Sequence, residues 1–441
     1  MSRMDETAAR WLTSAEGLTV VERATAALDA GEDALTISAR LARDVADTQC
    51  RAAAVDAAVC RRRARARWAD ADRLLFTRES LEQASDPAVA AHRARSLLAR
   101  AAGEGSRWQG TVLDLGAGVG GDAIALARAA SPHGGEVVAI DTDAARLRLL
   151  AHNAEVAGVT VTTRCADVLE VRSGPGVVGH ADPGRRAGDR RIRRLSEHLP
   201  SVPALLAAHA DALHLAVALS PGVEPEDPDL PPGLEVEYVQ LGAALVEATV
   251  WTGAAAAPST GSGVTSRAAE APSAQRRATL LDGDVDGGGA ADGGEVARLA
   301  PGACDPLPVG DIGGWLIEVA PAAVRARQHD ALGASIGARR VARTRALLTC
   351  DAAPPDSPWY RALPVLAVLS ARPKAVRRWL RAAEDAHHLD GGVEIVLHGV
   401  DTDPTRLWQQ LGRPPRGPQG VRLAFIRRDH DTVAVACRTV E

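Results

Sequence analysis

The sequence predicts an α/β protein with a doubly wound parallel sheet, an N-terminal helical region and a small C-terminal α+β domain. Its 441 residues exceed the usual size of one domain, so two or three domains are expected. Between residues 111 and 219, short apolar stretches alternate with helical ones, which is typical of βαβ units. The first apolar stretch runs into a glycine-rich turn and then a helix, a pattern that places a ligand at the end of a strand.

The N-terminal region, residues 1–105, is expected to be mostly helical. Its stretch from Ala34 to Arg67 is rich in Ala, Arg and Leu and contains few helix breakers. Five arginines cluster near the end of that stretch: Arg61, Arg62, Arg63, Arg65 and Arg67. They allow two interpretations, a solvated helix face or an electrostatic footprint for a phosphate backbone.

The central domain, residues 106–282, predicts alternating strands and helices. The strands are Thr111–Leu115, Val137–Ile140, Val159–Thr163, Gly176–His180 and Leu213–Leu219. The helices between them are Ala123–Ala130, Ala144–Ala157 and Val202–Ala210. Because such crossovers are right-handed, these strands form a doubly wound sheet. Three further strands could close it: Glu235–Gln240, Leu245–Trp251 and Arg277–Leu281.

Two segments lack the apolar residues needed to fold alone. An Ala/Ser/Gly/Pro-rich insert at about residues 253–273 and a linker at residues 283–312 are expected to be flexible. From residue 313 to residue 441 the pattern predicts a small α+β domain. Its expected strands are Trp315–Val319, Glu394–Leu397 and Arg422–Ile426, and its expected helices are Ala322–Leu332, Ala375–Ala386 and Thr405–Leu411.

Bulk properties exclude several classes of protein. The formal charge of −5 means that the whole molecule is not a basic nucleic-acid binder. Any prediction of nucleic-acid binding must therefore rest on local clusters of positive charge. Six scattered cysteines without a C-x-x-C pair suggest neither a zinc site nor a disulfide framework, and no metal is expected. The N-terminus lacks the apolar stretch of a signal peptide, and no run of about 18 apolar residues predicts a membrane span. We therefore expect a cytoplasmic protein; the oligomeric state is not predicted.

The densest functional signal is VLDLGAGVGGD, residues 112–122. Gly116, Gly118 and Gly120 let the backbone approach a ligand without a Cβ clash, and the amides at the start of the next helix can bind its polar end. The same letters satisfy G-x-G-x-x-G through Gly116, Gly118 and Gly121, which alone would equally suggest a dinucleotide.

Three carboxylates narrow the choice of ligand. Asp114 stands two residues before the first glycine and is suited to an ammonium group, such as the methionine end of S-adenosylmethionine. Asp141 closes the second strand, where a carboxylate can accept from both ribose hydroxyls of either ligand. Asp167 follows the third strand and could accept from an adenine amino group, with Val168 packed near the ring.

The order D-x-G-x-G-x-G, then DTDAARLRLLAHNAEVAGV, then CADV resembles class I methyltransferases over about residues 80–282. This resemblance implies a seven-stranded Rossmann-like domain that binds S-adenosylmethionine across the carboxyl ends of its strands. The residues expected to bind that cofactor are Asp114, Gly116, Gly118, Gly120, Asp122, Asp141, Asp167 and Val168.

The fourth strand ends in HADPGRR, at the place that faces the methyl donor in class I methyltransferases. Asp182 is the catalytic candidate, because a carboxylate there could hold or deprotonate the nucleophile; it could also only shape the donor pocket. The second proline and the aromatic residue of nucleic-acid amino methylases are missing. Six arginines follow: Arg185, Arg186, Arg190, Arg191, Arg193 and Arg194.

Those arginines could make bidentate contacts with phosphate, or they could belong to a solvated loop. We take Pro183, Arg185 and Arg186 as candidates for substrate binding. Upstream, the helix in LEQASDPAVAAHRARSLL could bring Glu82, Gln83 and Ser85 to the pocket, or it could only pack against the sheet.

LEQAS…AHRA, DLGAGVGGD, HADPGRR and ALSPG together resemble a bacterial family of class I methyltransferases with a THUMP-like C-terminal domain. RALPVLAVLSARPKAVRRWLR and VEIVLHGVDTDPTRLWQQLG resemble the THUMP-like part. The resemblance implies an RNA substrate, because THUMP modules bind RNA, and a base in tRNA or rRNA as the methylated group. Two alternatives stay open: a methyltransferase acting on a protein or small molecule, and a non-catalytic RNA-binding protein.

Overall fold

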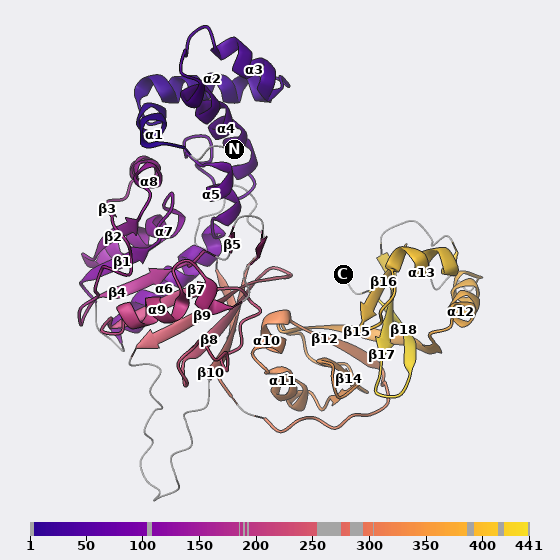
Figure 1. The fold of residues 1–441 in the computed structure, drawn as a ribbon. Helices are drawn as coiled ribbons and strands as arrows, with labels where there is room; N and C mark the ends of the chain where they lie inside the picture. Colours follow the sequence, from indigo (N-terminus) through magenta and orange to yellow (C-terminus); the bar gives the residue numbers. More distant parts are fainter. Residues whose placement is uncertain are drawn as a thin grey trace, which may run out of the picture. The chain divides into compact units, whose positions relative to one another are not determined.

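The computed structural model of the 441-residue chain forms two compact units, residues 1–296 and 297–441 (Figure 1). The residues that the structure describes are 4–103, 108–184, 186–187, 190–191, 194–253, 275–282, 294–302, 304–385, 392–412 and 419–439. The insert expected at about residues 253–273 therefore lies, apart from Gly253, outside the described residues.

The first unit begins with a helical region that packs on the central domain. Its helices are α1 (Glu6–Leu12), α2 (Ala15–Asp29), α3 (Ala34–Leu41), α4 (Thr48–Ala64), α5 (Arg78–Gln83) and α6 (Pro87–Ala102). The stretch from Ala34 to Arg67, expected to be mostly helical, forms two helices, and Asp47 caps the first amides of the second, α4. Buried apolar residues of these helices form one core with Val119 and Leu149 of the central domain.

The arginine cluster at the end of α4 makes contacts within the protein itself. The guanidinium of Arg61 is buried and donates to the carbonyl of Leu74 (3.0 Å). Arg65 pairs with Asp29 (2.9 Å) and Asp72 (2.7 Å). The other three also have partners: Arg62 with Asp29, Arg63 with Glu82, and Arg67 with the carbonyl of Leu81. These contacts favour a structural role for the cluster over a footprint for phosphates.

A mixed sheet forms the centre of the first unit, in the order β11-β10-β8-β9-β7-β4-β1-β2-β3. Its strands are β1 (Thr111–Leu115), β2 (Glu136–Asp141), β3 (Thr162–Cys165), β4 (Val178–Ala181), β7 (His214–Leu219), β8 (Glu235–Leu241), β9 (Ala244–Gly253), β10 (Gln275–Leu281) and β11 (Glu295–Leu299). The five strands from β3 to β7 in this order are parallel, and β9 is antiparallel to both neighbours. The helices that connect them are α7 (Gly121–Ala130), η1 (Ser131–His133), α8 (Ala144–Val156), η2 (Leu195–Glu197) and α9 (Val202–Ala208).

The sheet differs from the expectation at its edges. Over the described residues it contains nine strands, whereas the family resemblance implied seven. The stretch Glu295–Leu299, expected to be part of a flexible linker, forms β11 beside β10. An edge strand needs backbone partners on only one side, so a stretch of five residues suffices.

In the described part of the second unit, seven strands form one sheet in the order β13-β14-β12-β15-β18-β17-β16. Its strands are β12 (Trp315–Val319), β13 (Arg339–Arg340), β14 (Leu347–Cys350), β15 (Tyr360–Ser370), β16 (Gly392–His398), β17 (Gln419–Arg427) and β18 (Thr432–Arg438). Its helices are α10 (Pro321–Arg325), α11 (His329–Ser335), α12 (Pro373–Asp385) and α13 (Pro404–Leu411). The single helix expected at Ala322–Leu332 is split in two, because Arg327 adopts a left-handed conformation (φ 57°).

The two outer helices of this unit pack against one part of its sheet. Val376 and Leu380 of α12 share a core with Leu407 of α13 and Phe425 of β17. Across the residues that the structure describes, every helix is too short or too polar to cross a membrane.

Candidate active site

Three of the predicted site segments meet at the carboxyl edge of the parallel strands. Leu115, the last residue of β1, is paired with Ile140 of β2 and with Ala181 of β4. Gly116, Asp141 and Asp182 follow these residues along the chain, so the register carries all three to the same edge. In open α/β sheets this edge is where ligands bind.

The glycine loop has the backbone shape that its sequence requires. Gly116 (φ 89°), Gly118 (φ 54°) and Gly120 (φ 96°) lie in the left-handed region, which side chains other than glycine rarely adopt. A Cβ at Gly116 or Gly118 would meet no atom within 4 Å, so open space lies beside the loop. The loop leads directly into α7, whose first amides can receive the polar end of a ligand.

Asp141 ties this loop to the second strand. Its carboxylate accepts from the backbone N–H of Gly118 (2.9 Å) and from that of Asp143 (2.8 Å). Each carboxylate oxygen therefore accepts from one backbone amide and keeps capacity for another donor. The arrangement fits a carboxylate that holds the loop and accepts from ribose hydroxyls.

Asp114 is buried beneath the loop and is paired with a histidine. Its Oδ1 lies 2.9 Å from Nδ1 of His180, which is its register partner on β4. Among the described residues, neither Oδ2 of Asp114 nor Nε2 of His180 has a hydrogen-bond partner, although both atoms are buried. Burial raises the pKa of Asp114 and His180 opposes that rise. An unpaired buried acceptor is costly, so this oxygen fits a site that a donor group completes.

His180 is a residue that the motifs alone did not single out, since it shows no metal-ligand spacing. The signal that could have found it is its position in HADPGRR, two residues before Asp182 on the strand beside Asp114.

Asp122, also expected to contact the cofactor, has protein partners on both of its oxygens. One oxygen forms an ion pair with Arg93 of α6, and the other accepts from the hydroxyl of Ser85 (3.2 Å). Arg93 is itself buried and also pairs with Glu247 of β9. Burial acts to raise the pKa of Asp122, but the charge of Arg93 outweighs it and the pKa lies below its ordinary value. This network ties α6 to the start of α7.

The turn after β3 carries the last two predicted cofactor contacts. Asp167 is exposed and accepts from the backbone N–H of Leu169 (2.9 Å). Val168 is buried, and its carbonyl lies 3.0 Å from Nε2 of His209. The backbone N–H of Ala166 donates to the carbonyl of Asp141 (3.1 Å), so this turn is joined to the end of β2.

The predicted substrate side of the site is described only in part. Asp182 is half-buried and Pro183 is buried just beyond the end of β4. Gly184 exchanges two backbone hydrogen bonds with Leu199 (2.8 and 3.1 Å). Arg185 lies outside the described residues. Arg186 belongs to β5 (Arg186–Ala187), which pairs with β6 (Arg190–Arg191), and its side chain is also outside the description.

Comparison with known proteins adds to this geometry. Residues 112–178 match a family described as a methyltransferase domain. Uncharacterized S-adenosylmethionine-dependent methyltransferases from two strains of Mycobacterium tuberculosis are 29% identical over 368 residues, covering 82% of this chain and 88% of theirs. The chain therefore contains a class I methyltransferase domain that uses S-adenosylmethionine.

The likeness extends over both units of this methyltransferase. A crystal structure of a candidate methyltransferase from Porphyromonas gingivalis W83 has a TM-score of 0.69 and covers 97% of this chain and 99% of its own. Its sequence identity is 16%, so it shows the shared fold and no more.

Proposed function

We propose that this methyltransferase acts on RNA, most simply on a base in tRNA or rRNA, and that its C-terminal unit is a THUMP-like domain that assists RNA binding. The observation that carries the catalytic part is the meeting of the glycine loop, Asp141 and Asp182 at one sheet edge, above the unpaired oxygen of Asp114. The RNA part rests on the arginine-rich segment after Asp182 and on the resemblance of both halves of the chain to a family with a THUMP-like domain.

The donor is held by residues of three neighbouring segments. Asp141 accepts from the ribose hydroxyls, and Val168 and Asp167 receive the adenine ring and its amino group. Asp114 supplies the negative charge that an ammonium group requires. S-adenosylmethionine supplies an already activated methyl group, so the chain itself needs little acid–base chemistry.

The main task of the acceptor side is positioning. Asp182 holds the nucleophile against the donor and can take up its proton, while Pro183 stiffens the turn. Arg185 and Arg186 bind phosphate and fix the register of the RNA without reading its sequence. Asp122, held by Arg93 and Ser85 at the start of α7, keeps acceptor capacity for the polar end of the cofactor.

The test of the catalytic role is Asp182→Ala. We expect methyl transfer to be lost, while the affinity for S-adenosylmethionine stays within about 1–2 kcal/mol of wild type. Calorimetry measures the affinity, and transfer of a labelled methyl group into RNA measures activity. Unchanged turnover in the variant would refute the role of Asp182.

The test of the acceptor is nucleoside mass spectrometry of RNA from a deletion strain. We expect one methylated nucleoside to be missing, and RNA from that strain to accept methyl groups from the purified protein. If all methylated nucleosides persist and the label enters a protein or a small molecule instead, the acceptor is not RNA. If S-adenosylmethionine binds but no fraction is labelled, the chain is a non-catalytic binding protein.

A further inference from the structure

The helix α12 of the C-terminal unit carries several exposed cations and no anion along its first turns. Five residues at the start and along the outer side of α12 are exposed: Arg372, Lys374, Arg377, Arg378 and Arg381. The inner side of the same helix is buried through Val376 and Leu380 against the sheet and α13. No acidic residue interrupts residues 372–381, which include the only lysine of the chain.

Several other arginines of the unit pair with carboxylates inside it. Arg340 pairs with Asp330, Arg422 with Glu318, and Arg428 with Asp431. Among residues whose side chains are described, none forms an ion pair with the five cations of α12. With respect to the side chains that the structure describes, these cations are therefore left to bind an anion from solution.

The charge of the chain is divided between the two units. Residues 297–441 carry 20 Lys or Arg and 15 Asp or Glu, although the whole chain carries 51 and 56. The C-terminal unit is therefore basic within an acidic protein. A basic surface is the usual electrostatic signature of a nucleic-acid contact.

The spacing of the cations suits an extended polyanion. Lys374, Arg377, Arg378 and Arg381 follow the i, i+3, i+4, i+7 pattern of one helix face. At about 1.5 Å of rise per residue they extend over roughly 10 Å, enough to meet several phosphates of one strand. Guanidinium groups bind phosphate oxygens in bidentate fashion.

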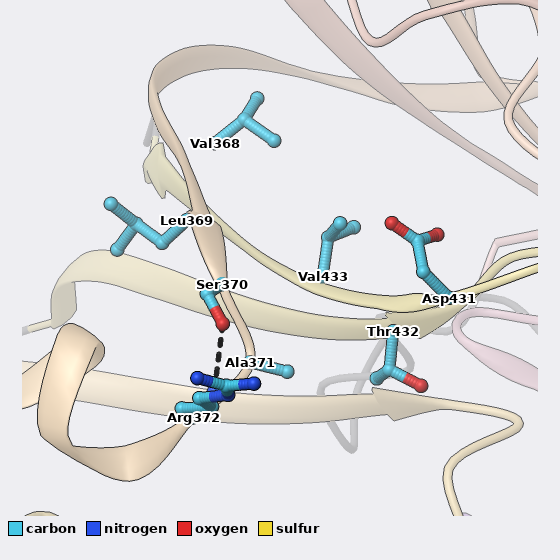
Figure 2. Close-up of a pocket in the computed structure, with 8 residues that line it drawn as sticks. All are labelled: Val368, Leu369, Ser370, Ala371, Arg372, Asp431, Thr432 and Val433. Atoms are coloured by element: carbon cyan, nitrogen blue, oxygen red, sulfur yellow. Dashed lines mark hydrogen bonds between the residues drawn. The ribbon is translucent and has the colours of Figure 1, made fainter.

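Arg372 continues this face into a hollow at the start of α12 (Figure 2). The hollow has a volume of about 650 Å³ and is lined by Val368, Leu369, Ser370, Ala371, Arg372, Asp431, Thr432 and Val433. The hydroxyl of Ser370 accepts from the backbone N–H of Arg372 (3.4 Å), which fixes the turn between β15 and α12. The carboxylate of Asp431 is neutralised by Arg428 (2.7 Å).

We propose that the basic face of α12, residues 372–381, docks the sugar–phosphate backbone of the RNA substrate. The proposal rests on RNA being the acceptor. An anionic membrane is the other polyanion that such a helix could meet. Membrane-surface helices bury their apolar face in the lipid, whereas the apolar side of α12 is already buried in the protein. The observations therefore favour RNA.

The test uses the full chain and the triple variant R377E/R378E/R381E. The probe is an end-labelled, unmodified tRNA transcript, and binding is followed by fluorescence anisotropy between about 50 and 200 mM salt. We expect the variant to lose at least about 30-fold in affinity at low salt. The slope of log K against log salt should become shallower by roughly two to three. Affinity for S-adenosylmethionine should be unchanged.

A matched control and a milder variant make the result specific. R43E/R73E/R128E makes the same change of charge at exposed arginines of the first unit and should cost less than about threefold in affinity. If the glutamate variant misfolds, R377Q/R378Q/R381Q keeps good helix formers at all three positions and should show the same loss in weaker form.

The outcomes separate this proposal from the proposed function. Equal losses in the α12 variant and the control, with RNA still bound by wild type, would overturn the docking face alone. Wild-type protein that binds S-adenosylmethionine but no RNA would overturn the RNA acceptor. Binding to phosphatidylserine vesicles that depends on the three arginines, without RNA binding, would assign the face to a membrane and overturn the proposal.

Discussion

At the scale of single residues, Asp114 and His180 control the charge beneath the glycine loop. Both side chains are buried, and their polar atoms lie 2.9 Å apart. Burial acts to lower the pKa of His180, but the carboxylates of Asp122 and Asp114 outweigh burial and the opposing charge of Arg93, so the pKa is raised. The Asp114–His180 pair is neutral when His180 is protonated and carries one negative charge when it is not.

The first prediction is that affinity for S-adenosylmethionine rises with pH. Because the pKa of His180 is raised, the pair is neutral below that pKa and becomes anionic as the pH rises through it. An anionic pair attracts the ammonium group of the ligand. We therefore expect affinity, measured by calorimetry, to rise as the pH increases above about 6.5, the ordinary pKa of histidine, until the ammonium group itself loses its proton near pH 8. His180→Asn should flatten the profile, and an equal pH dependence in both proteins would contradict the assignment.

A second prediction concerns the carboxylate itself. Asp114→Asn removes the charge but keeps the size of the side chain, so we expect affinity for S-adenosylmethionine to fall at least about tenfold. Stability should be unchanged or slightly higher, because burial disfavours the charged form of Asp114. Calorimetry and urea unfolding measure the two effects. A variant that binds normally would show that the unpaired oxygen of Asp114 has no part in the site.

At the scale of elements, Arg93 holds α6 to the rest of the first unit. Its side chain is 2% exposed and pairs with Asp122 of α7 and Glu247 of β9. Asp122 has a lowered pKa, so its contribution to stability is present above its unfolded pKa and is lost as the pH falls through the lower folded value.

The third prediction is that Arg93→Met destabilises the first unit by about 3–5 kcal/mol at pH 7, because two buried carboxylates lose their cation. The loss should shrink as the pH falls towards about 5, where an unpaired buried carboxylate takes up a proton. Urea unfolding at the two pH values measures it. The double variant R93M/E247Q should recover part of the stability, and a cost independent of pH would show that packing, not charge, is the role of Arg93.

The elements were predictable from sequence where the pattern was strong and local. β1, β7 and β12 lie within one residue of their expected bounds, because each is a short apolar run between turns. The long strand β15 was not foreseen, since Pro364 argues against a strand. The structure accommodates this proline just before an irregularity in the pairing with β18, between Val365 and Ala367.

Some residues of the candidate site were also predictable from local sequence patterns, and others were not. Asp114, Asp141 and Asp182 were found because each stands at a fixed place relative to a strand or glycine motif. Arg93 and His180 were not, because their partners lie 29 and 66 residues away along the chain. The sheet register brings His180 to Asp114, and the packing of α6 brings Arg93 to Asp122.

At the scale of the whole molecule, the proposed binding sites for the methyl donor and for RNA phosphates lie in different units. The glycine loop and all the predicted cofactor residues lie within residues 1–296, whereas the α12 face belongs to residues 297–441. Each unit has hydrophobic cores of its own. The predicted donor site is therefore built from side chains of the first unit.

The last prediction follows from that division. A fragment of residues 1–302, which keeps β11 intact, should fold and bind S-adenosylmethionine within about threefold of the full chain, a difference below 1 kcal/mol. Its affinity for the tRNA transcript should fall at least about tenfold, because the cations of α12 are gone. Circular dichroism, calorimetry and anisotropy measure folding and the two affinities. A folded fragment that no longer binds S-adenosylmethionine would mean that the second unit completes the donor site, and one that keeps full RNA affinity would place the phosphate contacts in the first unit.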